Sequence, residues 1–236
     1  MNLVLFEPGE LGAPLPRADL RAVHILTVLR RAAGDAFNAG VVNGPIGSAT
    51  LESVDDRELR FVFTPARQPP SLPDITLVVG MPRPPTARDI LRDATTMGVR
   101  AIHFVSTERT HEGFATSSLW RDDEWRKLLV QGAAQACDTQ LPIVTWTHSL
   151  IGALAKAPPG DWLALDNYEA SGHLSAWKPA AENTPIVLAI GPERGWGPRD
   201  RERLRAAGGT LLHLGARVLR VEMAVVAALA LLQARR

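Results

Sequence analysis

The chain has 236 residues, and its 26 basic and 25 acidic side chains give a formal net charge of +1. This balance excludes a histone-like polycation, so any nucleic acid must bind at local basic patches. The single cysteine excludes a disulfide framework and any metal site built from several cysteines. The apolar runs are too short to span a membrane, and the N-terminus lacks the basic region of a secretory signal. We therefore expect a cytoplasmic protein with no membrane segment and no metal.

The first 66 residues are predicted to form a compact β-barrel with one helix. The helix is expected over 17–33 and is ended by Gly34 and Asp35. The strands are expected in short runs bounded by glycine, proline or aspartate: 3–6, 36–42, 47–54 and 58–63.

Three prolines in the stretch Arg67–Pro73 disfavour both a helix and a central strand, so this stretch is the predicted linker. We therefore expect one domain over residues 1–67 and a second over residues 74–236.

From Asp74 onwards, apolar strands alternate with helices, which predicts an α/β domain with a parallel sheet covered on both faces. Strands are expected at 75–80, 101–105, 143–146, 162–165, 186–190 and 211–214. Helices are expected at 86–97 (with Thr86 as N-cap), 118–136, 150–156, 199–207 and 219–233. Ligands in such sheets bind beyond the carboxyl ends of the strands. Three loops take that position, after Leu165, Ile190 and Leu214.

The loop after Ile190 reads Gly-Pro-Glu-Arg-Gly-Trp-Gly and precedes a helix. Glycines let a ligand approach the backbone, and the start of a helix offers free N–H groups. The spacing matches neither a dinucleotide fingerprint nor a P-loop. A tight turn that binds nothing explains the pattern equally well.

The loop after Leu214 carries Arg217, Arg220 and Glu222 directly before an apolar helix. Because residues 224–232 contain no charged or polar side chain, this helix must be buried in the core or against a partner chain. The charged residues therefore lie at the rim of something buried. A solvated helix start, with Glu222 favoured by the helix dipole, remains the alternative.

These two segments, IGPERGWG and LGARVLRVEMA, together resemble the RsmE family of 16S rRNA uridine methyltransferases. That family shows IGPEGG followed by F or W, and then LGxRILRxETA near its C-terminus. Further segments are similar in the same order: HILTVLR with Gly34-Asp35, LRDATTMGV with STER, and AQACD with Leu141-Pro142. The resemblance covers nearly the whole chain.

The resemblance implies an N-terminal PUA-like RNA-binding β-barrel and a C-terminal SPOUT domain with a deep trefoil knot. It also implies S-adenosyl-L-methionine as cofactor, a homodimer formed through the C-terminal helix, and methylation of N3 of a uridine in 16S rRNA of the small ribosomal subunit. Arg220 is expected to stabilise the developing uracil anion or to orient the base, and Glu222 is expected to orient an arginine or a group of the partner chain rather than to act as the base. The expected cofactor-binding residues are Leu165, Asp166, Ile190, Gly191, Pro192, Glu193, Gly195, Leu214, Gly215, Val218 and Leu219.

The predicted first helix carries the expected RNA contacts. The spacing of four of its residues places them on one helix face: Arg17, Arg21, His24 and Arg31. Such a face could meet phosphates, although a solvated helix face explains the pattern as well. The residues expected to contact RNA are Arg17, Arg21, His24, Arg30 and Arg31.

Several positions depart from the family pattern. Asp93 stands where the pattern has a lysine, and Cys137–Thr139 lack the arginine that the pattern has there. Two further departures fall within the C-terminal motifs. Arg194 stands where the pattern has a glycine, and Met223 stands where it has a threonine. These departures keep a second hypothesis open, a catalytically silent RNA-binding or ribosome-assembly protein that retains the fold. A Rossmann-like enzyme without a knot is a third hypothesis.

Overall fold

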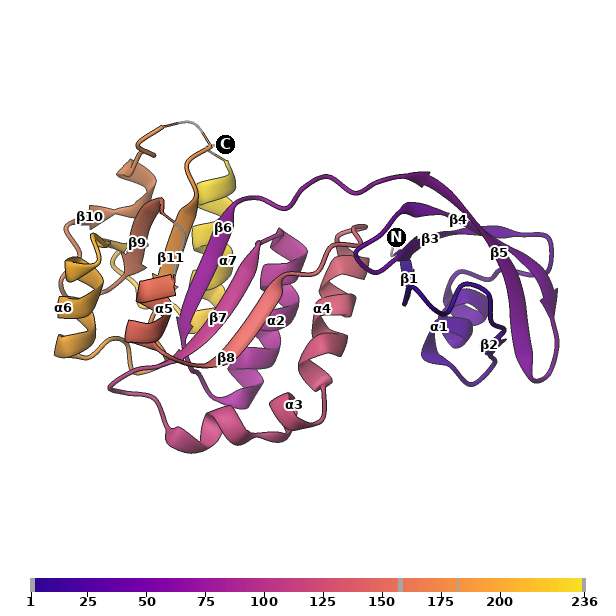
Figure 1. Cartoon of the computed structure of the whole chain (residues 1–236), viewed down its shortest axis with the longest axis horizontal. Helices are drawn as coiled ribbons and strands as arrows, with labels where there is room; N and C mark the ends of the chain where they lie inside the picture. Colours follow the sequence, from indigo (N-terminus) through magenta and orange to yellow (C-terminus); the bar gives the residue numbers. More distant parts are fainter. Residues whose placement is uncertain (1–2, 157–158, 182, 235–236) are drawn as a thin grey trace. The chain divides into compact units, whose positions relative to one another are not determined.

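The computed structural model describes residues 3–156, 159–181 and 183–234, and it forms two compact units (Figure 1). The first unit contains Met1–Ser71 together with Ala133–Leu141. The second contains Leu72–Gly132 and Pro142–Arg236. No helix within the described part of the chain is long and apolar enough to cross a membrane.

The first unit is built on a five-stranded sheet in the order β1-β3-β4-β5-β2. β1 pairs with β3 in parallel, and the other pairs are antiparallel. Buried side chains such as Phe6, Ile25 and Phe61 fill its core. The strands are β1 (Val4–Phe6), β2 (Leu15–Pro16), β3 (Ala36–Val41), β4 (Ile46–Val54) and β5 (Glu58–Arg67).

The helix expected over 17–33 is wrong in length. It begins at Leu20, because the Asp19 carboxylate accepts the Arg21 N–H as an N-cap, and α1 (Leu20–Val23) continues into a π-helical turn, His24–Val28. Arg30 then adopts a left-handed φ of 54°, which no helix can continue through.

Arg21 anchors this short helix to the rest of the first unit. Its guanidinium bonds the Glu10 carboxylate at 2.6 and 2.9 Å and the Asp19 carboxylate at 2.8 and 3.0 Å, and it lies 5.1 Å from the centre of the Phe6 ring. Hydrogen bonds from Arg21 lower the pKa of both carboxyl groups, and the two carboxylates in turn raise the pKa of Arg21.

The segment Ala133–Leu141 completes the first unit from a distant part of the sequence. The Ala134 carbonyl accepts the Leu3 N–H at 3.1 Å, and the Thr139 hydroxyl donates to the Gly44 carbonyl at 2.6 Å. Thr139 is fully buried, and a Cβ on Gly40 would lie 2.5 Å from its methyl group. A glycine is therefore required where this segment packs on β3.

The second unit is an α/β fold around a parallel sheet, as the sequence predicts, but the sheet has seven strands rather than the six expected, because the two-residue β10 was not predicted. The strand order is β10-β12-β9-β11-β6-β7-β8. The central strand β11 is buried at every residue, which is typical of a sheet covered on both faces. The strands are β6 (Ile75–Gly80), β7 (Ala101–Ser106), β8 (Ile143–Ser149), β9 (Asp161–Leu165), β10 (Gly172–His173), β11 (Ile186–Ile190) and β12 (Thr210–His213).

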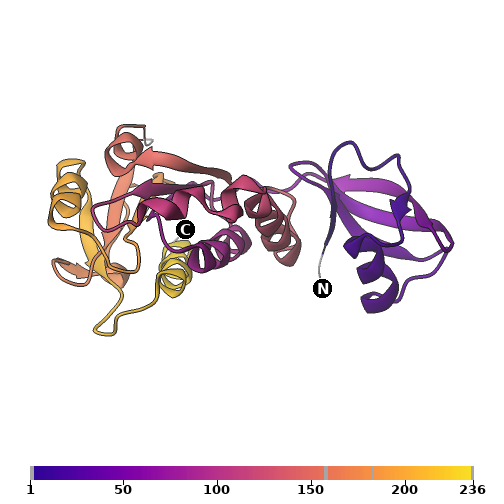
Figure 2. The same ribbon diagram turned by 90° about the horizontal axis from the view of Figure 1, so that it is seen from below.

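Helices cover both faces of this sheet (Figure 2). α7, α2 and α4 lie in a row on one face, and α5 and α6 lie on the other, where Leu150, Trp196 and Leu204 pack with strand residues in one cluster. The helices are α2 (Pro84–Met97), α3 (Ser118–Arg121), α4 (Glu124–Gln135), α5 (Leu150–Lys156), α6 (Pro198–Ala206) and α7 (Val221–Gln233).

Two expected helices differ in detail. α2 begins at Pro84 rather than after Thr86, because proline is suited to the first helical turn, and Thr86 lies buried inside the helix. The helix expected over 118–136 is broken into α3 and α4 at Asp123, whose φ is 53°. The strands and the remaining helices lie within a few residues of their expected positions.

The Arg21 ion pairs predict a pH-dependent loss of stability in the first unit. Arg21→Met removes a partly buried guanidinium with two carboxylate partners, and we expect it to cost about 1–3 kcal/mol at pH 7. Because the pKa values of Glu10 and Asp19 are lowered by folding, their stabilisation is complete above pH 5 and is lost as the pH falls below about 4. The difference between wild type and variant should therefore shrink in acid, measured by hydrogen exchange of the first unit.

Arg60→Met is the matched control, because it removes an exposed pair with Glu58 and should cost less than about 1 kcal/mol. An equal cost for both variants, or a difference that does not shrink as the pH falls from 5 towards 3, would contradict this interpretation.

Candidate active site

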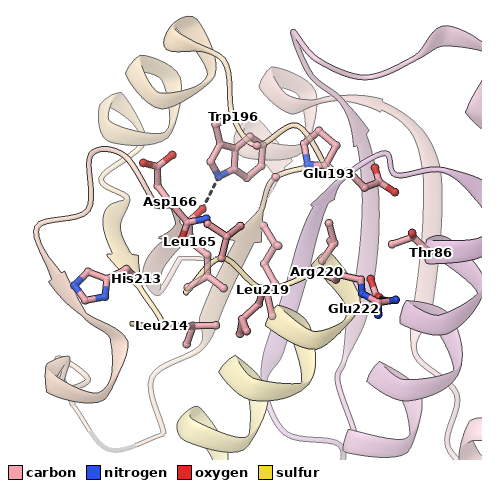
Figure 3. Close-up of a pocket in the computed structure, with 18 of the residues that line it drawn as sticks. Thr86, Leu165, Asp166, Glu193, Trp196, His213, Leu214, Leu219, Arg220 and Glu222 are labelled. Atoms are coloured by element: carbon pink, nitrogen blue, oxygen red, sulfur yellow. Dashed lines mark hydrogen bonds and ion pairs between the residues drawn. The ribbon is translucent and has the colours of Figure 1, made fainter. Parts of the chain in front are cut away.

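One cavity of about 340 Å³ lies in the second unit, beyond the carboxyl ends of three neighbouring strands (Figure 3). Leu165 of β9 is in register with Ile190 of β11 and with Leu212 of β12. The loops that follow these strands therefore begin at nearly the same level, and they line the cavity together with the first residues of α2 and α7.

The loop after β11 depends on glycine at a specific position. Gly195 adopts a φ of +68°, and its N–H donates to the Pro192 carbonyl at 2.7 Å to close a turn. Arg194, the residue before it, does not adopt a positive φ. Its side chain is exposed, and its backbone carbonyl accepts a hydrogen bond from Arg109 Nη1 at 2.6 Å. The arginine is therefore accommodated without backbone strain.

Gly80, the last residue of β6, packs closely against the same loop. A Cβ at Gly80 would lie 2.3 Å from the Pro192 Cδ and 2.8 Å from its backbone nitrogen. A side chain at this position must push the β11 loop away from β6. No pattern in the sequence indicates this role of Gly80, because Pro192 lies more than a hundred residues later in the chain.

Trp196 joins the β11 loop to the β9 loop. Its indole is fully buried, and Nε1 donates to the Leu165 carbonyl at 2.9 Å (Figure 3). The next residue in the β9 loop, Asp166, accepts the N–H groups of Tyr168 and Glu169 at 2.7 and 2.6 Å. These bonds fix the backbone of the β9 loop where it lines the cavity.

The Asp166 carboxylate has a further partner in α6. Arg201 Nε donates to it at 2.8 Å, and both side chains are almost fully buried, at 6% and 2% exposure. A buried carboxylate with three donors is already satisfied. Asp166 therefore stabilises the wall of the cavity through its side chain.

The loop after β12 carries the exposed charges of the site. The Gly215 N–H donates to His213 Nδ1 at 3.0 Å, and Gly215 has a φ of +116°. Arg220 is the N-cap residue of α7, but its side chain makes no capping bond and is 77% exposed. Its Nη1 lies 3.7 Å from the carboxylate of Glu222, which is 17% exposed. The guanidinium is thus oriented by a neighbour while it remains accessible.

Two further contacts in the second unit were not predicted, and the first of them lies at the cavity. The Glu193 carboxylate accepts the Arg83 N–H at 3.1 Å, which connects the β11 loop to the start of α2. Glu108 accepts the backbone N–H of Arg199 at 2.9 Å at the start of α6, and a Cβ at Gly197 would collide with it. Only the tertiary structure reveals these contacts, since each joins residues about 90 or more positions apart.

Comparison with known proteins decides the family. The sequence model of an RNA methyltransferase domain matches residues 69–233. The ribosomal RNA small subunit methyltransferase E of Treponema pallidum is 34% identical over 99% of this chain and 91% of its own length. The chain belongs to the ribosomal RNA small subunit methyltransferase E family. The Bacillus subtilis member is 26% identical over 87% of this chain and 84% of its own length.

Solved structures agree with this membership. The family member from Neisseria gonorrhoeae, bound to S-adenosyl methionine, superposes with a TM-score of 0.75 at 25% identity and covers 98% of this chain and 97% of its own. A putative methyltransferase from Legionella pneumophila has the same fold, with a TM-score of 0.80 at 22% identity and coverage of 99% of this chain and 98% of its own. The recognition made from the sequence motifs is therefore confirmed.

The structure brings nearly all the residues expected to bind the cofactor around the one cavity, and Arg220 and Glu222 line it as well. Gly215 is not among the lining residues, although it shapes the loop that contributes them. Their role in binding stays a prediction. The expected residues that line the cavity are Leu165, Asp166, Ile190, Gly191, Pro192, Glu193, Gly195, Leu214, Val218 and Leu219.

Met223, the second departure within the C-terminal motifs, does not line the cavity in the described part of the chain. Its side chain is 52% exposed on α7. Replacing the pattern's threonine with methionine therefore leaves the lining unchanged, just as Arg194 leaves the Gly195 turn intact. Neither departure gives structural support to the hypothesis of a catalytically silent protein.

The expected RNA contacts are not on one helix face, because Arg17 and Arg31 lie outside the shortened helix. Arg21 is occupied by two carboxylates, and His24 Nε2 is buried without a hydrogen-bond partner. Arg17 donates to the Asp55 carbonyl at 2.7 Å. The argument from helix spacing is therefore wrong. Arg30 and Arg31 are exposed, and RNA contact stays a prediction.

The close approach of Gly80 to Pro192 predicts that Gly80→Ala destabilises the second unit. An added methyl group in a packed position costs about 1–3 kcal/mol, and here it must displace the loop that lines the cavity. We expect a lower melting temperature by several degrees.

Gly172→Ala is the matched control, because the Cβ there would meet nothing closer than 4.0 Å. Differential scanning calorimetry of both variants tests the prediction, and equal melting temperatures would contradict it.

Proposed function

We propose that this protein methylates N3 of a uridine in the 16S rRNA of the small ribosomal subunit, with S-adenosyl-L-methionine as the methyl donor. The observation that carries the proposal is the cavity formed where the β9, β11 and β12 loops meet, with an exposed arginine at its rim. The relatives of this chain are named as small-subunit rRNA methyltransferases, and the Neisseria gonorrhoeae structure is bound to S-adenosyl methionine. A ribosomal substrate implies a cytoplasmic location.

The residues of the cavity fit this cofactor. A volume of about 340 Å³ lies within the range of small-molecule sites. Gly191 and Gly195 leave the backbone of the β11 loop bare on the cavity wall. Leu165, Ile190 and Leu219 supply the apolar wall that an adenine ring requires. When bound, S-adenosyl-L-methionine supplies a methyl group activated on a sulfonium.

Arg220 is the proposed catalytic residue. Removing the N3 proton leaves negative charge on the uracil carbonyl oxygens, and a guanidinium at the rim can donate hydrogen bonds to that charge. The Glu222 carboxylate forms an ion pair with the same guanidinium, 3.7 Å from Arg220 Nη1, and so favours its position at the rim. Since the Arg220 side chain does not cap α7, a role in starting the helix does not account for it.

The first unit is proposed to be a PUA-like RNA-binding domain. Its five-stranded sheet with one short helix supports this assignment, and exposed Arg30 and Arg31 at the end of that helix are available for phosphates.

The second unit is proposed to be a SPOUT domain with a trefoil knot. β11 lies between β6 and β9, although β9 comes first in the chain. The chain then continues to β12 beyond β9 and returns to α7, which packs against β11 and α2. This return supports a threaded C-terminal segment.

A homodimer through α7 is also proposed. Val225, Ala228 and Leu229 face the core, while Met223 and Ala230 are exposed on the same apolar helix. A second copy would remove these side chains from water. Light scattering that gives a monomer mass at micromolar concentration would contradict the dimer.

The function is tested by mapping N3-methyluridine in 16S rRNA from cells with and without the gene. We expect one position to lose its methyl group in the deletion strain and to regain it on complementation. In parallel, calorimetry with purified protein should give micromolar or tighter S-adenosyl-L-methionine binding. Unchanged rRNA together with silence in calorimetry would overturn the proposal in favour of a catalytically silent ribosome-assembly protein.

Arg220→Ala should separate catalysis from cofactor binding. A contact made to charge that develops in the transition state affects turnover rather than affinity, and losing one such donor costs about 3 kcal/mol, or roughly a hundredfold in rate. We expect single-turnover methylation to fall by about that factor, with cofactor affinity and melting temperature nearly unchanged. Normal turnover in a folded variant would contradict the role, and a lower melting temperature with unchanged specific activity would indicate a structural arginine.

A further inference from the structure

Tyr168 is the only tyrosine of the chain, and its side chain is left largely unburied at the cavity. The residue is 76% exposed and lines the cavity from the loop after β9. An aromatic ring of this size normally stabilises a protein by being buried. Its exposure beside a ligand cavity therefore indicates a surface kept for binding.

The ring is held by a rigid framework rather than by a mobile loop. The Tyr168 N–H donates to the buried Asp166 carboxylate at 2.7 Å, and Asp166 is itself paired with the buried Arg201. The Arg201 guanidinium also lies 5.2 Å from the centre of the Tyr168 ring. A backbone bond and a cation–π contact thus orient the ring while most of its surface remains open.

The surroundings of Tyr168 suit a nucleotide. Val218, in the loop after β12, also lines the cavity and is also 76% exposed, so a second apolar side chain borders the same opening. Arg217 and Arg220 line it too and are exposed. A flat aromatic ring, an aliphatic side chain and guanidinium groups together offer a planar base its stacking surface and offer a phosphate its counter-charge.

We propose that Tyr168 is the stacking platform for the RNA base that receives the methyl group. The inference rests on the proposed function, since it assigns a residue to the substrate of that reaction. Single-stranded bases that are turned out of a helix are commonly held by stacking on aromatic side chains. Such a stack would hold the pyrimidine ring at the opening of the cavity that takes the cofactor.

The adenine of the cofactor is the other planar ring that could stack on Tyr168, and the experiment must distinguish the two. If the ring binds the RNA base, Tyr168→Ala should leave the Kd for S-adenosyl-L-methionine within about twofold of wild type. With small subunits from the deletion strain as substrate, its kcat/KM should fall about tenfold, mainly through KM. Tyr168→Phe keeps the ring and should stay within about twofold of wild type in both measurements.

Ile151→Ala is the matched control, because Ile151 is 53% exposed on α5 and does not line the cavity in the described part of the chain. It removes an exposed apolar side chain of the same unit and should change neither constant. Because Tyr168 buries little surface, the melting temperature of Tyr168→Ala should also match that of wild type.

Chemical modification gives a readout that is independent of turnover. Tetranitromethane nitrates tyrosine, and the single tyrosine makes the product unambiguous by mass spectrometry of the peptide. Small subunits from the deletion strain should protect Tyr168 from nitration, whereas S-adenosyl-L-methionine alone should not. The Cys137→Ser background removes the exposed thiol as a competing target.

Each result decides the inference. Protection by the cofactor alone, or a weaker cofactor affinity in Tyr168→Ala, would overturn it in favour of an adenine contact. Wild-type kinetics in Tyr168→Ala, or failure of small subunits to protect the ring, would overturn it while leaving the proposed function intact. If the wild-type protein itself transferred no methyl group, the function would fail, and nitration would still decide whether Tyr168 contacts the subunit.

Discussion

The candidate site depends on the bond from the Trp196 indole to the Leu165 carbonyl, which joins two loops 31 residues apart in sequence. Parallel strands in register bring the loops to the same level, but register alone does not fix the path of the chain beyond the strand ends. A buried N–H needs an acceptor, and the nearest one is the last carbonyl of β9. This bond constrains the backbone that lines the cavity, and such preorganisation lowers the entropic cost of binding a ligand.

Carboxylates and guanidiniums have different roles around this cavity. Asp166 and Glu108 accept backbone N–H groups, Asp166 also pairs with Arg201, and all of these contacts lie within the protein. Arg217 and Arg220 remain exposed. The lining also carries Asp166, Glu193 and Glu222, so its formal charges balance. Under the proposed function, the exposed guanidiniums of Arg217 and Arg220 would be the groups that meet the phosphates of an RNA substrate.

The sequence predicts the second unit well because its signals are local. Continuous apolar runs predict buried parallel strands, and the glycine-rich segment after Ile190 and the Gly215 segment after Leu214 predict loops that line the cavity. The sequence predicts too long a first helix, because an arginine at position 30 does not indicate the left-handed backbone that ends it. The partners of Gly80 and Asp166 could not be inferred, since each contact joins segments that only the folded sheet brings together.

The packing of Ala133–Leu141 into the first unit limits how the two units can be separated or exchanged between proteins. A genetic exchange that moved residues 1–71 alone would leave behind buried Thr139 and its bond to Gly44, and Gly40 would lose the Thr139 methyl group that packs against it. The first unit is therefore not a portable module, although a proline-rich stretch follows it. An intact first unit can be exchanged only if both of its chain segments, 1–71 and 133–141, move together.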